Sequence, residues 1–299
     1  MARVTFGLKF RQKFLLSLIL CLSALWAAPD DDIPVMADPV SFALAAISTD
    51  GQAYEAKETP VAQSCQKAGG EMIITSLRTE LLPLPLDYRV YLPPCYKQDF
   101  RRKYPVLLLV HGQSYTDDQW DRLGADETLD SLLAAGEISP FIIVMPRDRY
   151  GGQPTENNFA RVVVEELFPL LEKRYRILDD RQYRAVGGLS RGAGWAIHLG
   201  IFYWQKFGII GAHSPAVFHT DAQQMRTWLD KIPAGKHPMV YMDIGQRDRP
   251  EILESANWFE RVLDEKDVPH QWRLFSGFHS EEYWRSHMKQ YLRWYAKNW

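Results

Sequence analysis

The sequence is poor in cysteine and has almost no net charge, and these two properties argue against a disulfide-rich scaffold and a nucleic-acid-binding protein. It contains only three cysteines, whereas small secreted scaffolds held by disulfides need many more. With 35 basic and 37 acidic side chains its formal net charge is -2, so no basic excess marks a nucleic-acid partner. Histidines and cysteines do not pair at the short spacings of a zinc site. The sequence therefore predicts no nucleic acid, no metal and no cofactor.

The N-terminus lacks an apolar run long enough for an ordinary membrane span. Four basic residues precede the apolar run 14–28, whereas a spanning helix needs about 20 residues. This arrangement is typical of a secretory signal peptide, so residues 1–28 are expected to be an export or lipoprotein signal, with an uncleaved anchor as the alternative. Cys21 is a candidate lipidation site, although Leu20 stands where lipoprotein signals usually have a small residue. The protein is therefore expected outside the cytoplasm: secreted, periplasmic or membrane-anchored as a lipoprotein, with any membrane attachment through the N-terminus only.

The chain between this signal and the first predicted strand has no sustained hydrophobic period. Residues 29–64 contain several prolines and three consecutive aspartates, and they are expected to be a flexible linker to a domain at 65–299. Export permits disulfides, and with Cys21 in the signal the cysteines Cys65 and Cys95 remain as an even pair. A predicted hairpin near residue 83 would bring them together. We expect a disulfide, and two separate buried thiols are the alternative.

Short apolar runs that alternate with amphipathic segments predict an α/β domain. An antiparallel strand pair is expected at 72–77 and 88–92, across a turn that contains prolines. Unbroken apolar runs at 106–110 and 141–145 suit parallel strands covered on both faces. Alternation with helical patterns predicts a mostly parallel, twisted sheet with helices on both faces, which is an α/β-hydrolase arrangement. Further strands are expected at 183–186, 207–212, 239–244 and 272–275.

The motif that indicates chemistry is Gly-Leu-Ser-Arg-Gly at residues 188–192. A strand pattern runs into this motif and a helical pattern leaves it, which is the setting of a nucleophile elbow. Glycines flank the serine where a tight, strained turn would exclude a Cβ atom. Ser190 is therefore the candidate nucleophile. The alternative is a glycine-rich turn whose serine only caps a helix.

A serine hydroxyl is a weak nucleophile unless a base takes its proton. In this fold the acid and then the histidine follow the serine along the chain. His279 is the best placed histidine, because it follows the last predicted strand and precedes the C-terminal helical pattern. Asp248 follows an earlier strand and is the expected acid, with Glu251 as its competitor. Asp243 still lies inside that strand, where a structural role is expected.

A tetrahedral intermediate also needs backbone N–H donors for its oxyanion. One donor is expected from Arg191, directly after the nucleophile, and the second from Gln113, in the loop after the strand 106–110. His111 precedes Ser190 in the same loop and is expected to be structural.

These motifs together resemble a known family. Over residues 71–299, matching segments lie at 91–94, 104–106, 111–112, 187–192, 245–248 and 277–279, with Trp284 five residues later. The set is similar to that of the Putative esterase family, which includes feruloyl esterases, enterochelin esterases, S-formylglutathione hydrolases and the mycolyltransferases of the antigen 85 group. The resemblance implies an α/β-hydrolase fold with Ser190 as nucleophile, Asp248 as acid and His279 as base. Some members use a glutamate slightly later in that loop, which keeps Glu251 open.

The expected function is that of an exported serine carboxylic-ester hydrolase acting through an acyl-enzyme on Ser190. The formylglutathione hydrolases of this family are cytosolic, so the signal argues against that branch. The expected substrates are small-molecule, carbohydrate or siderophore esters. The alternatives are an acyltransferase of the mycolyltransferase type and a non-catalytic binding protein with the same fold, although a complete set of serine, acid and histidine argues against the latter.

Overall fold

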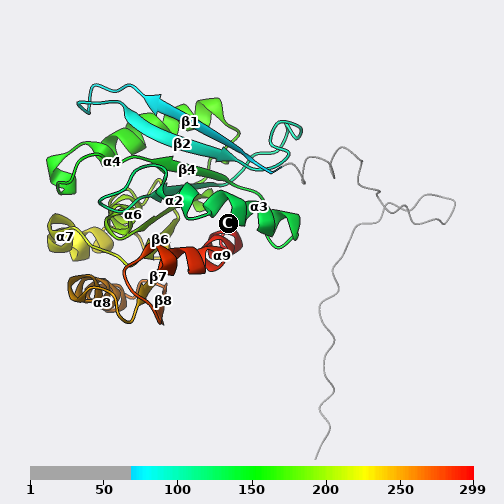
Figure 1. The fold of residues 1–299 in the computed structure, drawn as a ribbon. Helices are drawn as coiled ribbons and strands as arrows, with labels where there is room; N and C mark the ends of the chain where they lie inside the picture. The colour runs from blue at the N-terminus through cyan, green and yellow to red at the C-terminus, as the bar shows by residue number, and fades with distance from the viewer. Residues whose placement is uncertain (1–68) are drawn as a thin grey trace, which may run out of the picture. The chain divides into compact units, whose positions relative to one another are not determined.

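One eight-stranded sheet organises residues 69–299, the part of the chain that this computed structural model describes (Figure 1). The expected signal, linker and Cys65 lie outside the described residues. The strand order is β1-β2-β4-β3-β5-β6-β7-β8, in which β1–β2 and β2–β4 are antiparallel and all other pairs are parallel. The strands are β1 (Glu71–Leu77), β2 (Leu86–Leu92), β3 (Val106–Val110), β4 (Ile142–Pro146), β5 (Arg184–Leu189), β6 (Ile209–His213), β7 (Met239–Gly245) and β8 (His270–Phe275). The predicted α/β fold with a mostly parallel sheet is confirmed.

Helices cover both faces of the sheet (Figure 1). Helices α3 and α9 pack on one face, and α4 to α8 contribute to the opposite face. The helices are α2 (Gln119–Arg122), α3 (Ala125–Ala134), α4 (Phe159–Arg161), α5 (Phe168–Arg174), α6 (Arg191–Phe202), α7 (His219–Asp230), α8 (Pro250–Glu265) and α9 (Glu281–Lys297), with a π-helical turn at Val162–Leu167 and 3-10 turns at Pro154–Glu156 and Arg181–Tyr183.

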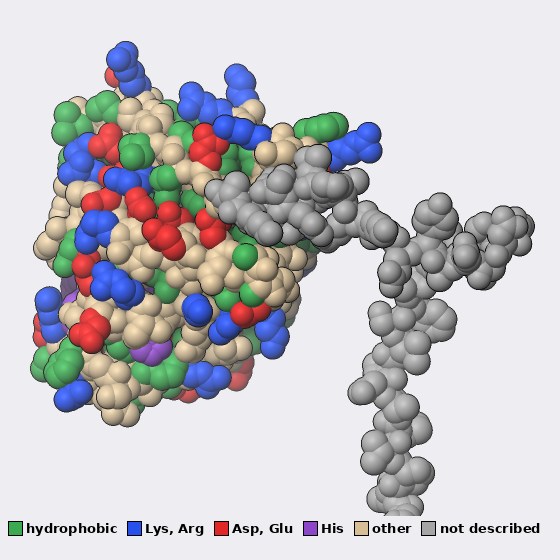
Figure 2. All heavy atoms as spheres, turned by 45° about the vertical axis from the view of Figure 1, so that its right-hand side comes forward, with side chains coloured by type: hydrophobic (Ala, Val, Ile, Leu, Met, Phe, Trp, Pro, Cys, Tyr) green, Lys and Arg blue, Asp and Glu red, His purple; other side chains and the backbone are tan. Residues whose placement is uncertain are grey.

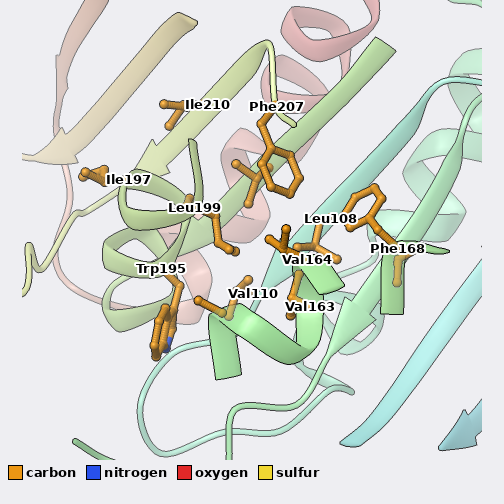
Figure 3. Packing of buried hydrophobic residues seen from close by; sticks show 14 of the residues in the cluster. Leu108, Val110, Val163, Val164, Phe168, Trp195, Ile197, Leu199, Phe207 and Ile210 are labelled. Atoms are coloured by element: carbon orange, nitrogen blue, oxygen red, sulfur yellow. The ribbon is translucent and has the colours of Figure 1, made fainter. Parts of the chain in front are cut away.

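Strand β3 explains why an unbroken apolar run predicts a central strand. Successive side chains of a strand point to opposite faces, so Leu108 and Val110 enter one buried cluster while Leu107 and Leu109 enter the other. Figure 3 shows the first cluster, where Val110 lies near Trp195 of α6 and Leu108 lies near Val164. Because both faces are covered, every residue of β3 is buried and a polar side chain would have no access to water.

The described surface carries charges of both signs. Lysine, arginine, aspartate and glutamate side chains are interspersed over the face that Figure 2 shows. Within residues 69–299, no helix combines the length and the apolar character that crossing a membrane requires.

Candidate active site

Ser190 occupies the sharp turn between β5 and α6. Its backbone has φ 56° and ψ -121°, a sparsely populated conformation for a residue with a side chain. A Cβ atom at Gly188 would lie 2.1 Å from the carbonyl oxygen of Gly192, and one at Gly192 would lie 2.1 Å from that of Val110. Both glycines of the motif are therefore needed because backbone atoms approach them closely. The turn exposes the Ser190 hydroxyl at the carboxyl end of the parallel strands.

The structure brings the three predicted triad residues together. His279 follows β8, and its Nε2 atom lies 2.9 Å from the Ser190 hydroxyl oxygen. Asp248 follows β7, and its Oδ1 atom lies 2.8 Å from Nδ1 of His279. This separation is that of an ion pair, although Nδ1 of His279 makes no hydrogen bond of good geometry within residues 69–299.

Asp248 is held in place by its neighbour in the chain. Its Oδ1 atom also accepts a 2.7 Å hydrogen bond from the backbone N–H of Arg249, and its side chain is fully buried. The other oxygen, Oδ2, has no hydrogen-bond partner among residues 69–299. A buried carboxylate with spare accepting capacity is suited to a partner that becomes positively charged, as an imidazole does when it takes a proton.

The two competing acids lie elsewhere. Glu251 is exposed in the first turn of α8, and no contact joins it to His279. Asp243 is fully buried inside β7, where it accepts hydrogen bonds from Tyr283 at 2.6 Å and Tyr291 at 2.8 Å. Its other oxygen lies 2.6 Å from Nδ1 of His213. Burial, reinforced by the Asp243 charge, raises the pKa of both tyrosines, so they remain protonated donors.

The histidine loop rests on a buried tryptophan. The ring of Trp284, on α9, meets the His279 ring edge-on with centroids 5.0 Å apart. The indole N–H donates a 3.3 Å hydrogen bond to Ser214, just after β6. The sequence resemblance included Trp284, and the structure supplies its physical role as a support for the imidazole.

Gln113, one of the two predicted oxyanion donors, lines a pocket of about 140 Å³, and Arg191 directly follows Ser190, which also lines it. This pocket is lined by Ser190, His279, the loop 112–115 and Arg249, among others. The Gly112 N–H is occupied by a 2.8 Å bond to the side chain of Gln119. Within residues 69–299, the backbone N–H groups of Gln113 and Arg191 donate to no protein acceptor. They are therefore available to a ligand.

His111 braces the oxyanion loop. Its Nδ1 atom lies 2.7 Å from the carbonyl oxygen of Gly112, which can only accept, and its Nε2 atom lies 2.9 Å from the N–H of Asp148, which can only donate. These contacts fix a neutral imidazole with the proton on Nδ1. Burial lowers the pKa of His111 in agreement with that state. The structural role expected for this residue matches its surroundings.

The side chain of Arg191 has a role that sequence reasoning missed. Its guanidinium forms a buried ion pair with Asp148 at 2.9 Å and donates to the carbonyl oxygens of Tyr150 and Gly152. Asp148 also accepts a 2.7 Å bond from the indole N–H of Trp195. The loop after β4 is thus tied to the helix that starts at the nucleophile. The signal in the sequence that could have indicated this role is the charge of Arg191 inside the serine motif, where a buried partner is needed.

Among residues 69–299, one group of side chains could hold a metal ion, and it lies on α8 and β8. Glu260, Asp264 and His270 place one ligand atom each within 4.8 Å of one another. Sequence reasoning did not single out these residues. None of them lines the pocket at Ser190.

Comparisons with known proteins identify the family of the chain. The sequence profile described as Putative esterase matches residues 80–295. The Endo-1,4-beta-xylanase/feruloyl esterase of Xylanibacter ruminicola is 37% identical over 114 residues, which cover 34% of this chain and 16% of that protein. The Iron(III) enterobactin esterase of Escherichia coli is 23% identical over 201 residues, which cover 63% of this chain and 48% of that protein. The chain thus spans less than half the length of these two curated relatives.

Solved structures show the same fold. A ferulic acid esterase superposes with a TM-score of 0.68 and 26% identity, covering 77% of this chain and 99% of that chain. An S-formylglutathione hydrolase from Staphylococcus aureus, 18% identical, has a TM-score of 0.61 and covers 76% of this chain and 98% of that chain. The family profile matches well over half of the sequence. The chain therefore belongs to the Putative esterase family and has the α/β-hydrolase fold.

Proposed function

We propose that this chain is a serine esterase that hydrolyses carboxylic esters through an acyl-enzyme on Ser190. The observation that carries the proposal is the 2.9 Å contact between Nε2 of His279 and the Ser190 hydroxyl at a strained elbow. A nucleophile within hydrogen-bond reach of its base, with a carboxylate behind that base, is the arrangement that activates serine. Membership of an esterase family supports the same reaction class.

In this proposal the reaction runs in two halves. The Ser190 oxygen attacks the ester carbonyl carbon while Nε2 of His279 takes the hydroxyl proton. Asp248 stabilises the imidazolium, and the N–H groups of Gln113 and Arg191 bind the oxyanion. The C–O bond to the alcohol then breaks as His279 returns its proton to the leaving oxygen. Water repeats the sequence on the acyl-enzyme, releases the acid and restores Ser190.

The substrate is proposed to be a small-molecule, carbohydrate or siderophore ester. Relatives are named for feruloyl ester and enterobactin hydrolysis, which supports ester substrates of these kinds. We further propose that the chain is exported through residues 1–28, because a basic segment followed by a short apolar run is typical of a signal peptide. Cys21 is the residue that would be lipidated if the chain is a lipoprotein.

Purified protein should be tested on 4-nitrophenyl acetate with and without an excess of a simple alcohol such as methanol. Release of nitrophenol with acetic acid as the main acyl product is the expected result. Methyl acetate as the main product at low methanol would instead favour an acyltransferase. Absence of turnover on this ester and on a panel of feruloyl, acetyl-xylan and siderophore esters would contradict the proposal and favour the non-catalytic alternative.

A further inference from the structure

The pocket at Ser190 contains one arginine whose charge is not paired. Arg249 lines this pocket together with Ser190 and His279, and its side chain is exposed. Its guanidinium forms no ion pair and no side-chain hydrogen bond with any residue in 69–299, although its backbone N–H donates to Asp248. An arginine offers five N–H donors in a rigid fork that fits a carboxylate or phosphate. None of these donors is bonded to a residue in 69–299, so all five are free to meet a ligand at this pocket.

The acidic groups of the same pocket are already neutralised. Glu281 is the acidic side chain that lines it, and Arg122 pairs with that carboxylate at 3.2 Å. Gln119 donates a further 3.2 Å hydrogen bond to the same oxygen of Glu281. The carboxylate of Asp248 is buried beside His279. The lining therefore presents to a ligand one uncompensated positive charge, that of Arg249.

The position of Arg249 in the sheet indicates which half of an ester it would meet. Ser190 follows β5, and the oxyanion loop with Gln113 follows β3 on one side of that strand. Arg249 and His279 follow β7 and β8, on the other side. The departing alcohol takes its proton from the histidine, so it occupies the side of His279. Arg249 is therefore placed to meet the alcohol part of the substrate.

We infer that Arg249 is a specificity-determining residue that selects esters whose alcohol part carries an anionic group. This inference rests on the proposed esterase function and names the substrate class of that site. An ion pair made only when such a substrate binds would raise kcat/KM for anionic esters relative to neutral esters of the same shape.

The test compares matched esters on the whole protein. 3-Acetoxybenzoate and 3-acetoxybenzamide differ only in a carboxylate or a neutral amide on the alcohol part. The monophenyl ester of adipic acid and the phenyl ester of adipic acid monoamide place the same difference on the acyl part. In the wild type, kcat/KM for 3-acetoxybenzoate should exceed that for 3-acetoxybenzamide by about tenfold. A hydrogen bond to a charged group gives a discrimination of about this size. The acyl-side pair should show no such preference.

Variants assign the preference to one side chain. Arg249→Gln should bring the alcohol-side ratio close to one, and Arg249→Lys should retain part of it because the charge remains. Arg247→Gln is the matched control, since Arg247 stacks on the Phe278 ring at 4.2 Å and does not line the pocket. Its ratio should equal that of the wild type. Added salt should lower the wild-type ratio, because screening weakens an exposed pair.

Three results would overturn the inference while leaving the esterase function intact. These are equal turnover of the first two esters by the wild type, a preference confined to the acyl-side pair, and an equal loss of the ratio in Arg247→Gln. Absence of turnover on all four esters and on 4-nitrophenyl acetate would instead count against the proposed function itself. The two failures are thus distinguishable.

Discussion

The hydroxyl of Tyr283 donates a 2.6 Å hydrogen bond to Oδ2 of Asp243, which joins helix α9 to the buried interior of strand β7. A buried carboxylate depends on its donors, because an unsatisfied charge in the interior is costly. Tyr283→Phe should therefore lower the free energy of unfolding by about 1–3 kcal/mol. Urea denaturation followed by tryptophan fluorescence measures this change. Tyr115→Phe, at an exposed tyrosine, is the control and should shift stability by less than about 0.5 kcal/mol.

Ser190→Ala should abolish ester turnover and preserve the fold. Only a hydroxyl is lost, and the backbone turn is kept by the neighbouring glycines. We expect kcat to fall by about a million-fold, as occurs when a catalytic serine is removed from a triad that acts as a unit. A fluorophosphonate probe should label the wild type but not the variant. Equal labelling of the two proteins would rule out Ser190 as the nucleophile.

Asp248→Asn and Glu251→Gln separate the two candidate acids. Asp248 lies 2.8 Å from the His279 ring, so its change should lower kcat by about 10⁴-fold by disturbing the tautomer of the imidazole. Glu251 is exposed on α8, and its change should lower kcat by less than about tenfold. Steady-state kinetics on one chromogenic ester checks both. The reverse ranking would make Glu251 the acid and favour acyl transfer.

Gly187 and Tyr295 should be strongly coupled. A Cβ atom on Gly187 would lie 2.1 Å from the Tyr295 hydroxyl oxygen, so Gly187→Ala should destabilise the protein by about 1–3 kcal/mol. Tyr295→Phe removes that oxygen and also its 3.2 Å contact with His213. Gly187→Ala should therefore lower the free energy of unfolding by less in the Tyr295→Phe background than in the wild type. Strict additivity of the two unfolding free energies would show that the close approach is absent in solution.

Cys65 and Cys95 are proposed to form a disulfide in the exported protein. Closing a loop of roughly 30 residues would stabilise the chain by about 3–4 kcal/mol in the chain-entropy model. Denatured, unreduced protein prepared from an oxidising compartment should then show no reaction with a thiol reagent at these positions. Two titratable thiols would contradict the pairing. Cys65→Ser with Cys95→Ser should lower the unfolding midpoint even if activity is kept.

The strands were predictable because a sheet covered by helices on both faces requires apolar residues at successive positions of its central strands. The run 106–110 is apolar throughout because it is buried on both sides, and it forms β3 as expected. Each of the eight predicted strands is present, with ends shifted by at most three residues. The nucleophile elbow was also predictable, because close contacts with backbone atoms require glycine at positions 188 and 192.

The sequence favoured Asp248 as the acid without excluding Glu251, and it did not predict the buried polar contacts. Asp248 and Glu251 both follow β7, and only the start of α8 at Pro250 turns the glutamate toward solvent. Tyr283, which donates to Asp243, lies 40 positions away along the chain. Asp148, which pairs with Arg191, lies 43 positions away, so no local sequence pattern predicts either contact. The available signal for these buried contacts was a charged residue at an unexpected position, inside an apolar strand for Asp243 and inside the serine motif for Arg191.

The position of His279 after an edge strand has a consequence for how activity is lost. Within the described part of the chain, strand β8 pairs only with β7, and about half of its side chains are exposed. Edges of this kind open more readily than the centre of a sheet. Fraying of β8 would move the base away from Ser190 while β3 and β5 remain intact. On heating, activity should therefore be lost before the secondary structure is lost. The temperature of inactivation would then report the local opening of the edge strand β8.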